Sequence, residues 1–206
     1  MTNGSVRTAV VPRALAIASV ALLHVLVYFS VTRLTALRPA GAFIHPHIGL
    51  DDRIPHLPWT WPAYWLPYVL VPVAAGMAIG RLDPPAFGRL IAAWSGMIIL
   101  GGTIQVIWPA VAPWPPSPAF TQRLYHASPL ILPYATLPSM HVAHVAMAAL
   151  LAGTVFPSRR VQASGWLAVM TVALATLTLK EHVMLDAITG MALAAGAWSW
   201  WRRGMR

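Results

Sequence analysis

The sequence contains no cysteine and few charged residues of either sign. Without a thiol the chain forms no disulfide and offers no thiolate to a metal. Only 9% of its 206 residues are charged, whereas a soluble domain carries about 25%, so the chain cannot cover a water-facing surface. Basic residues outnumber acidic ones by 14 to 5, but they form no basic stripe interleaved with aromatics, and no nucleic-acid partner is expected.

The sequence has long hydrophobic runs instead. Hydrophobic residues make up 58% of the chain, and its mean hydropathy is +0.65. A helix of about 20 apolar residues crosses a bilayer core. The runs therefore predict an all-α integral membrane protein that forms a single polytopic domain over residues 1–206. Six spanning helices are expected near 12–31, 62–80, 88–108, 138–156, 163–179 and 183–201.

Two of these runs carry additional signals. The first is too long for the apolar core of a signal peptide, and the small-residue pattern PAGA at 39–42 lies well past its end, so we expect no cleavage there. The second run contains Pro62, Pro67 and Pro72. Membrane helices tolerate proline, so these residues predict a kinked helix.

The basic residues indicate the topology. With a cytoplasmic N-terminus, nine of the 14 bases fall inside, which is the bias that cytoplasmic loops show. Both termini are then cytoplasmic, and both long connections, 32–61 and 109–137, are external. We expect the chain in a bacterial plasma membrane. The internal bases are Arg7, Arg13, Arg81, Arg89, Arg159, Arg160, Arg202, Arg203 and Arg206; the external ones are Arg33, Arg38, Arg53, Arg123 and Lys180.

The stretch LPSMHVAHVAMAALLAG, 137–153, begins the fourth predicted span. Pro138 suits the opening of a helix, and Ser139 is a favoured N-cap. The amides of a first helical turn, together with the helix dipole, bind anions without a basic side chain. His141 lies in that turn, and we expect it beside any bound anion.

The stretch TLTLKEHVMLDAITG, 176–190, opens the sixth predicted span. His182 and Asp186 are four residues apart and share a helical face. The carboxylate can accept the ring N–H, which leaves the other imidazole nitrogen facing a cavity. Because the fourth and sixth spans both start at the outer face, Ser139, His141, His182 and Asp186 are expected at one membrane depth.

Two histidines and a carboxylate around an anion site suit phosphoryl transfer. A neutral imidazole is a good nucleophile toward phosphorus, and a second can protonate the departing alkoxide. Each piece also has a structural interpretation: an interfacial histidine is commonly a hydrogen-bonding anchor, and a single His-x-x-x-Asp pattern is frequent. A buried Asp within an apolar span is costly, however, and indicates a functional site.

The other histidines receive structural interpretations. His144, one turn below His141, is expected to hydrogen-bond a neighbouring helix, and His24 is expected to be structural. His45, His47 and His56 lie in the first external loop, where the HPH pattern suggests a metal site without a carboxylate-rich set to complete it. We expect no metal and no cofactor.

The two motifs resemble those of a known family. PSMH resembles the Pro-Ser-x-His motif of the type 2 phosphatidic acid phosphatase superfamily, and HVMLD with Gly190 resembles its closing His-x-x-x-Asp segment. The surroundings are most similar to the inositol-phosphorylceramide and sphingomyelin synthase-like branch: TLTLKEHVMLDAITG resembles its Thr-Leu…Gln-His…Asp…Gly run, and LDDRIPHLPWTWPAYW resembles its lead-in to the second helix. The resemblance covers about 50–190.

The resemblance implies a six-transmembrane-helix bundle and a phosphohistidine mechanism. It implies that His182 attacks phosphorus, that Asp186 orients it, and that His141 protonates the leaving group. The superfamily's Lys-x6-Arg-Pro motif has no counterpart, since 103–120 contains neither Lys nor Arg, and Thr176 stands where an Arg is usual. Arg123 and Lys180 are the candidates to bind phosphate in their place, with Ser139 at the helix start.

The sequence thus predicts a metal-independent membrane phosphatase or phospholipid head-group phosphotransferase that acts on a lipid phosphate or phospholipid at the outer face. Two alternatives remain. A non-catalytic relative would bind or translocate a lipid phosphate, which the missing motif favours. A metal hydrolase would place zinc among His141, His144, His182 and Asp186.

Overall fold

The computed structural model of the protein describes residues 3–114, 123, 127, 133–134 and 136–205. This part of the chain is helical and contains no strand, only isolated bridges between Ile44 and Ala110 and between Val111 and Tyr134. The six long helices confirm the predicted all-α fold. They are α1 (Asn3–Ala36), α3 (Pro67–Arg81), α4 (Pro84–Ile107), α6 (Met140–Val155), α7 (Arg159–Thr178) and α8 (Met184–Arg203).

Shorter elements lie in the connection between α1 and α3. They are the 3-10 turns η1 (Ala40–Ala42), η2 (Asp51–Arg53) and η3 (Pro58–Thr60), followed by the single-turn helix α2 (Trp61–Tyr64). By length and composition, four helical segments can cross a membrane: Val10–Ala36, Pro58–Arg81, Pro84–Ile107 and Arg159–Thr178. Met140–Val155 is apolar but shorter. The protein is an integral membrane protein.

The second predicted span is broken rather than merely kinked. α2 ends at Tyr64 and α3 begins at Pro67. Proline has no amide hydrogen and is favoured at a helix start, so Pro67 opens a new helix instead of bending an old one. Pro72 lies inside α3 without ending it.

Several helices begin earlier than hydropathy predicts. α4 starts at Pro84 rather than near 88, because the Asp83 carboxylate caps it by accepting the Ala86 amide at 2.7 Å. α7 starts at Arg159 rather than near 163, where Ser158 Oγ accepts the Val161 amide at 3.2 Å. Polar caps thus extend helices beyond their apolar runs.

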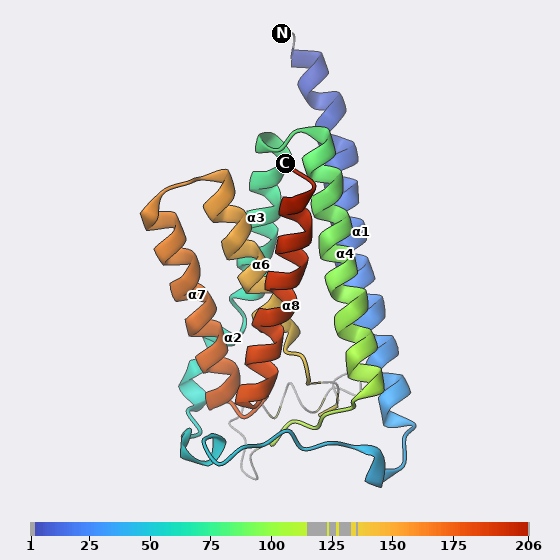
Figure 1. Ribbon diagram of the computed structural model, residues 1–206, viewed down its shortest axis with the longest axis vertical. Coiled ribbons are helices and arrows are strands. Elements are labelled where there is room, and N and C mark those ends of the chain that lie inside the picture. Colours follow the sequence, from blue (N-terminus) through green and yellow to red (C-terminus); the bar gives the residue numbers. More distant parts are fainter. Residues whose placement is uncertain (1–2, 115–122, 124–126, 128–132, 135, 206) are drawn as a thin grey trace.

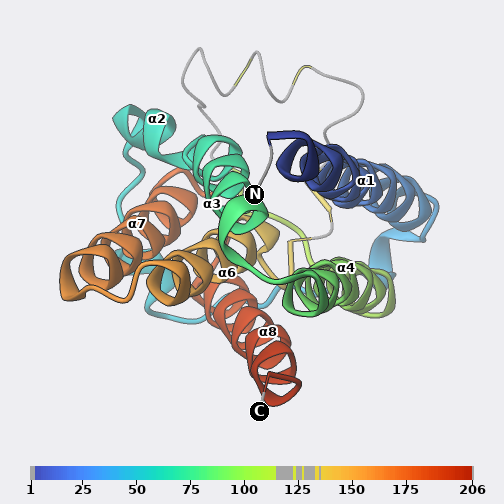
Figure 2. The ribbon, with the colours of Figure 1, turned by 90° about the horizontal axis from the view of Figure 1, so that it is seen from above.

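α6 lies in the middle of the bundle, with α3, α4, α7 and α8 around it (Figure 2). It is rich in alanine, and small residues let membrane helices approach closely. α1 packs on the outside against α4 and α3. Its contact with α4 is close, because a Cβ added at Gly102 would collide with Val27.

The two ends of the described chain lie at one end of the bundle, and the connection between α1 and α2 lies at the other (Figure 1). The chain between α1 and α2 crosses that second end and passes beneath the starts of α6 and α8. Both sequence motifs therefore open at the end of the bundle opposite the termini.

Candidate active site

The two motifs meet where α6 and α8 begin. The Ser139 amide donates to the Asp186 carbonyl at 2.9 Å, so the backbone of one motif is bonded directly to that of the other. Ser139 and Asp186 are both fully buried. One turn further along α8, Gly190 faces Ser139, and a Cβ there would collide with the Ser139 carbonyl oxygen. Glycine thus permits the close crossing that brings the motifs together.

We predict that Gly190→Ala destabilises the protein. The added methyl meets a backbone carbonyl that cannot rotate away, so α8 must shift from α6, at a cost of about 1–3 kcal/mol. The matched control is Gly196→Ala on the same helix, where an added Cβ has nothing within 4 Å. Thermal unfolding in detergent is expected to give a lower Tm for Gly190→Ala than for the parent protein, and a Tm equal to the parent's for Gly196→Ala. Equal Tm values would contradict the prediction.

His182 is paired with Asp186 as predicted, but the two residues do not share a helical face: α8 begins at Met184, its N-cap Val183 is extended, and His182 lies in the turn before the helix. The His182 Nδ1–H donates to Asp186 Oδ2 at 3.1 Å, since an ionised carboxylate can only accept. The same oxygen accepts the Val183 amide at 3.2 Å, so the carboxylate also caps α8. With Nδ1 engaged, Nε2 carries the lone pair of the neutral ring and is the nitrogen available for chemistry.

His141 lies opposite His182. Their ring centroids are 6.0 Å apart at an interplanar angle of 64°. His141 also packs on Tyr64, with centroids 4.3 Å apart and an angle of 32°. Its Nε2 atom is buried without a hydrogen-bond partner among the described residues, and the same holds for Asp186 Oδ1. Buried polar atoms normally have partners, so both are positions for a bound group.

The start of α6 has the geometry of an N-cap. Ser139 is extended, and its hydroxyl oxygen accepts the Val142 amide at 3.5 Å. Just before it, the Pro138 carbonyl accepts a hydrogen bond from Gln105 Nε2 of α4 at 3.0 Å. Gln105 therefore holds the backbone that leads into α6. The free amides of the first turn of α6 lie at the same end of the bundle as His141 and His182.

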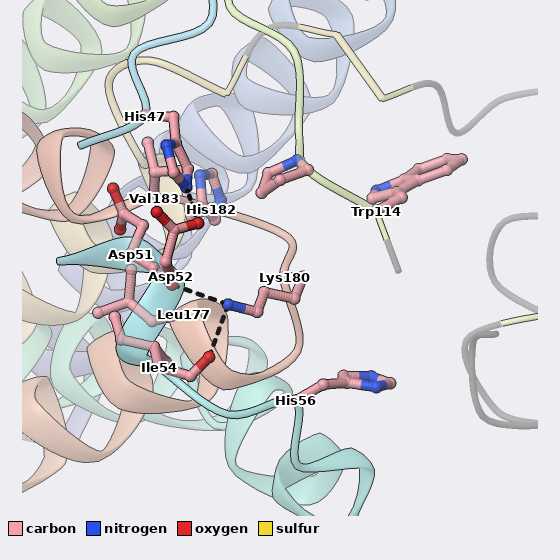
Figure 3. A pocket seen from close by; sticks show the side chains of 11 residues that line it. His47, Asp51, Asp52, Ile54, His56, Trp114, Leu177, Lys180, His182 and Val183 are labelled. Atoms are coloured by element: carbon pink, nitrogen blue, oxygen red, sulfur yellow. Dashed lines mark hydrogen bonds and ion pairs between the residues drawn. The ribbon is translucent and has the colours of Figure 1, made fainter. Parts of the chain in front are cut away.

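A cavity of about 280 Å3 has His182 in its wall. Figure 3 shows its lining side chains converging from the first connection, from the segment after α4 and from the turn before α8. Lys180 also lines it, but its ammonium donates to the backbone carbonyls of Asp51 at 3.0 Å and Ile54 at 2.7 Å. An ammonium has three donors, and these two bonds leave one for a ligand.

The three residues Lys180, Glu181 and His182 each reach a different element. Lys180 has a left-handed backbone conformation (φ 60°) and reaches the first connection, as described above. Glu181 is buried, and its Oε2 accepts the indole N–H of Trp114 at 3.0 Å. His182 turns to Asp186. The turn before α8 thus joins both long connections to the His182–Asp186 pair.

Asp51, in the first connection, also holds the start of α8. It is 4% exposed, and its Oδ1 accepts the amide of Met184, the first residue of α8, at 2.8 Å. Its Oδ2 accepts the Ile48 amide at 2.9 Å. A carboxylate from the first connection therefore caps the helix that carries Asp186.

Thr176 and Arg123, the two other positions that the sequence analysis related to phosphate binding, have different surroundings. Thr176, where the resemblance implies an Arg, is fully buried, and its carbonyl accepts the amides of Glu181 at 3.1 Å and His182 at 3.2 Å. It holds the backbone of the turn. Arg123 is exposed, and its carbonyl accepts the Ala127 amide at 2.8 Å; most of the surrounding loop lies outside the described residues.

The remaining histidines make other contacts: His24 and His144 pair with each other, whereas His47 and His56 line the cavity together with His182. Trp94 Nε1 donates to His144 Nδ1 at 2.8 Å, and His144 Nε2 lies 3.1 Å from His24 Nδ1. Because indole only donates, His144 must donate onward to His24, which links α4, α6 and α1 as the structural interpretation expects. His47 pairs with Asp52 at 3.1 Å.

No group of three or more His, Asp or Glu side chains within the described ranges is arranged to hold a metal. His144, a ligand in the zinc alternative, has both ring nitrogens directed at Trp94 and His24. The donor set of that alternative is therefore not assembled around one point.

Sequence reasoning missed four residues of the site: Asp51, Tyr64, Gln105 and Glu181. Gln105 is a polar residue inside an apolar run and was detectable as such. Asp51 and Glu181 belong to a set of only five acidic residues, so each was a candidate for a buried role. Tyr64 gave no signal, since aromatic residues are common near membrane interfaces.

A sequence model of the PAP2 superfamily, the superfamily of type 2 phosphatidic acid phosphatases, matches residues 58–200. The match covers α2 through most of α8, including both motifs. No curated protein and no solved structure matches the chain significantly. The match reaches the superfamily, and assignment to the synthase-like branch stays a prediction.

Proposed function

The chain belongs to the PAP2 superfamily of phosphatases and phosphotransferases, and on that basis we propose that it is a membrane lipid-phosphate phosphatase or phosphotransferase acting through a phosphohistidine intermediate. The observation that carries the proposal is the pairing of His182 Nδ1 with Asp186 across from His141, whose Nε2 is buried and unpartnered among the described residues. One imidazole is prepared as a nucleophile, and the other is placed where a leaving oxygen can bind.

In the first step, His182 Nε2 attacks phosphorus and forms a P–N bond as the P–O bond to the leaving alcohol breaks. His141 donates a proton to the departing oxygen, so the product leaves as a neutral alcohol. Asp186 keeps the His182 ring oriented and stabilises the positive charge that develops on it.

In the second step, water or an alcohol attacks the phosphohistidine. His141, now neutral, accepts the proton of the attacking hydroxyl, and the P–N bond breaks to regenerate His182. Water gives hydrolysis, and an alcohol gives transfer. The resemblance of the motif surroundings to the synthase-like branch favours transfer.

The phosphoryl oxygens need donors in both steps. The first-turn amides of α6 beside Ser139 supply an anion site of the kind found at helix N-termini, and the remaining donor of the Lys180 ammonium adds a positive charge at the cavity wall. Arg123 is assigned the third contact. With termini in the cytoplasm, this site opens at the extracytoplasmic face.

The test is direct detection of the intermediate. Purified protein is given a panel of 32P-labelled lipids, comprising phosphatidic acid, diacylglycerol pyrophosphate, isoprenyl pyrophosphate and phospholipid head-group donors, and is quenched during turnover. We predict protein-bound label that is stable in alkali and released by acid, as expected for a phosphoramidate. Vanadate, which mimics five-coordinate phosphorus, is expected to inhibit, and chelators are expected to leave the rate unchanged.

The alternatives give different results. Lipid-phosphate binding without turnover on any member of the panel would support the non-catalytic alternative. Activity lost to a chelator and restored by zinc would support the metal hydrolase. Turnover without a labelled intermediate, under conditions that trap one in a known phosphohistidine enzyme, would contradict the mechanism.

A further inference from the structure

The segment 57–64, which comprises η3 and α2, contacts His141 and the end of α7 that leads to His182. At its end, the Tyr64 ring lies 4.3 Å from the His141 ring, centroid to centroid. Tyr64 is 2% exposed and packs with Ala175 and Leu179 at the end of α7. Its ring therefore fills the space between His141 and the helix that leads to His182.

The same segment is bonded to that helix end. The Leu57 amide donates to the Thr178 carbonyl at 2.9 Å, and the hydroxyls of Thr60 and Thr178 are 2.9 Å apart. Thr178 ends α7 and precedes His182 by four residues. One short segment thus contacts His141 by packing and the His182 turn by hydrogen bonds.

His141 and His182 differ in what orients their rings. His182 has a carboxylate on Nδ1, whereas His141 Nε2 has no hydrogen-bond partner among the described residues. The His141 ring is placed between aromatic neighbours, with Tyr64 nearest and Tyr68 6.0 Å away. Its direction is therefore set by packing rather than by a hydrogen bond at Nε2.

We propose that Tyr64 is a positioning residue that holds the His141 imidazole in the orientation of a general acid, and that the segment 57–64 sets the spacing between the two histidines. The inference rests on the proposed function. The phenol face is suited to the task because it packs on a neutral imidazole and attracts a cationic one. The contact can therefore persist while His141 gives up and regains its proton.

The physical consequence depends on the leaving group. A poor leaving group, such as a lipid alkoxide, needs a proton from an aligned acid, which contributes about 10²–10⁴-fold to the rate. A nitrophenolate leaves without protonation. Loss of His141 alignment must therefore slow the first step, cleavage of the P–O bond, with the first class of substrate and spare that step with the second, whereas general damage to the fold slows it with both. The second step, in which His141 accepts a proton from the attacking hydroxyl, is common to both substrates, so the comparison is made on the first step alone.

The experiment compares the single-turnover rate of leaving-group release from phosphatidic acid and from p-nitrophenyl phosphate, or from the corresponding pair for whichever phosphoryl unit the lipid panel identifies. Tyr64→Leu removes the ring, Tyr64→Phe keeps it, and Tyr28→Leu is the control on α1. We expect Tyr64→Leu to lower the maximal rate of leaving-group release from the lipid about 10²-fold, as a misplaced catalytic group does, with the half-saturating lipid concentration unchanged and the rate of nitrophenolate release retained. Tyr64→Phe and Tyr28→Leu are expected to behave like the parent on both substrates.

Two reference variants separate the failure of this inference from failure of the proposed function. His141→Ala must show the same leaving-group dependence, and His182→Ala must lose both activities. If either does not, or if the parent protein turns over neither substrate, the proposed function fails and this inference fails with it. If both reference variants give these results, but Tyr64→Leu slows release from the two substrates equally or slows release from neither, only the positioning role of Tyr64 is overturned.

Discussion

His182→Ala is expected to lose turnover of every lipid phosphate substrate by about 10⁴-fold or more, as enzymes do when their covalent nucleophile is removed. The residue supplies the atom that bonds phosphorus. A second imidazole at the cavity, His47, is also paired with a carboxylate, but its partner Asp52 is exposed, and the pair belongs to the first connection rather than to the helix starts that hold His182, Asp186 and His141. The His141 ring lies 6.0 Å from that of His182, centroid to centroid, and packs on Tyr64. Head-group or phosphate release, measured by mass spectrometry, reads out the loss.

The same variant should lose the acid-labile protein-bound label, which ties the loss of activity to the intermediate. His45→Ala is the matched control, because His45 is an exposed histidine of the first connection. His182→Ala should leave the folded protein intact, since it removes one side chain at the cavity wall. Turnover by His182→Ala equal to that of His45→Ala would eliminate the phosphohistidine mechanism.

Asp186→Asn is expected to reduce kcat by about 10³–10⁴-fold, by analogy with the orienting carboxylate of a catalytic triad. The wild-type carboxylate accepts from His182 Nδ1 and the Val183 amide through one oxygen. An amide can present an N–H to the ring instead, which favours the tautomer with its hydrogen on Nε2. The nucleophilic lone pair is then lost, and the amide also cannot balance the charge on the phosphorylated ring.

Asp83→Asn provides the control for Asp186→Asn, because Asp83 is also a carboxylate that caps a helix, at the opposite end of the bundle. Both changes weaken a cap, but only one touches the catalytic histidine. Comparable Tm values with activity lost in Asp186→Asn alone are expected. Equal activities of the two variants would show that Asp186 only stabilises the fold.

The helical architecture was accessible from the sequence because a membrane span is specified locally. Its apolar length is fixed by the bilayer, and each helix satisfies its own backbone hydrogen bonds. Helix ends were less accessible, since Asp83 and Ser158 extend α4 and α7 beyond their apolar runs. The break at Pro67 depended on whether proline bends or starts a helix, and hydropathy does not distinguish these.

The site was predictable in part for a related reason. His182 and Asp186 lie four residues apart on one chain segment, so their proximity could be expected from the sequence, although His182 lies in the turn before α8 and only Asp186 lies in its first helical turn. The approach of His141 to His182 could be expected from the parity of the spans. The contacts of Asp51, Gln105 and Tyr64 could not, because each joins segments whose packing has no sequence spacing to express it.

By itself, the sequence determined that the chain lies in a membrane, that it forms six long helices, and that both motifs open at one end of the bundle. Only the tertiary structure decided that Lys180 bonds to backbone carbonyls, that Asp51 caps α8 and that Tyr64 lies against His141. Apolar length and helical period are properties of a single segment. Contacts between connections and helix ends are instead selected by the close packing of the whole bundle.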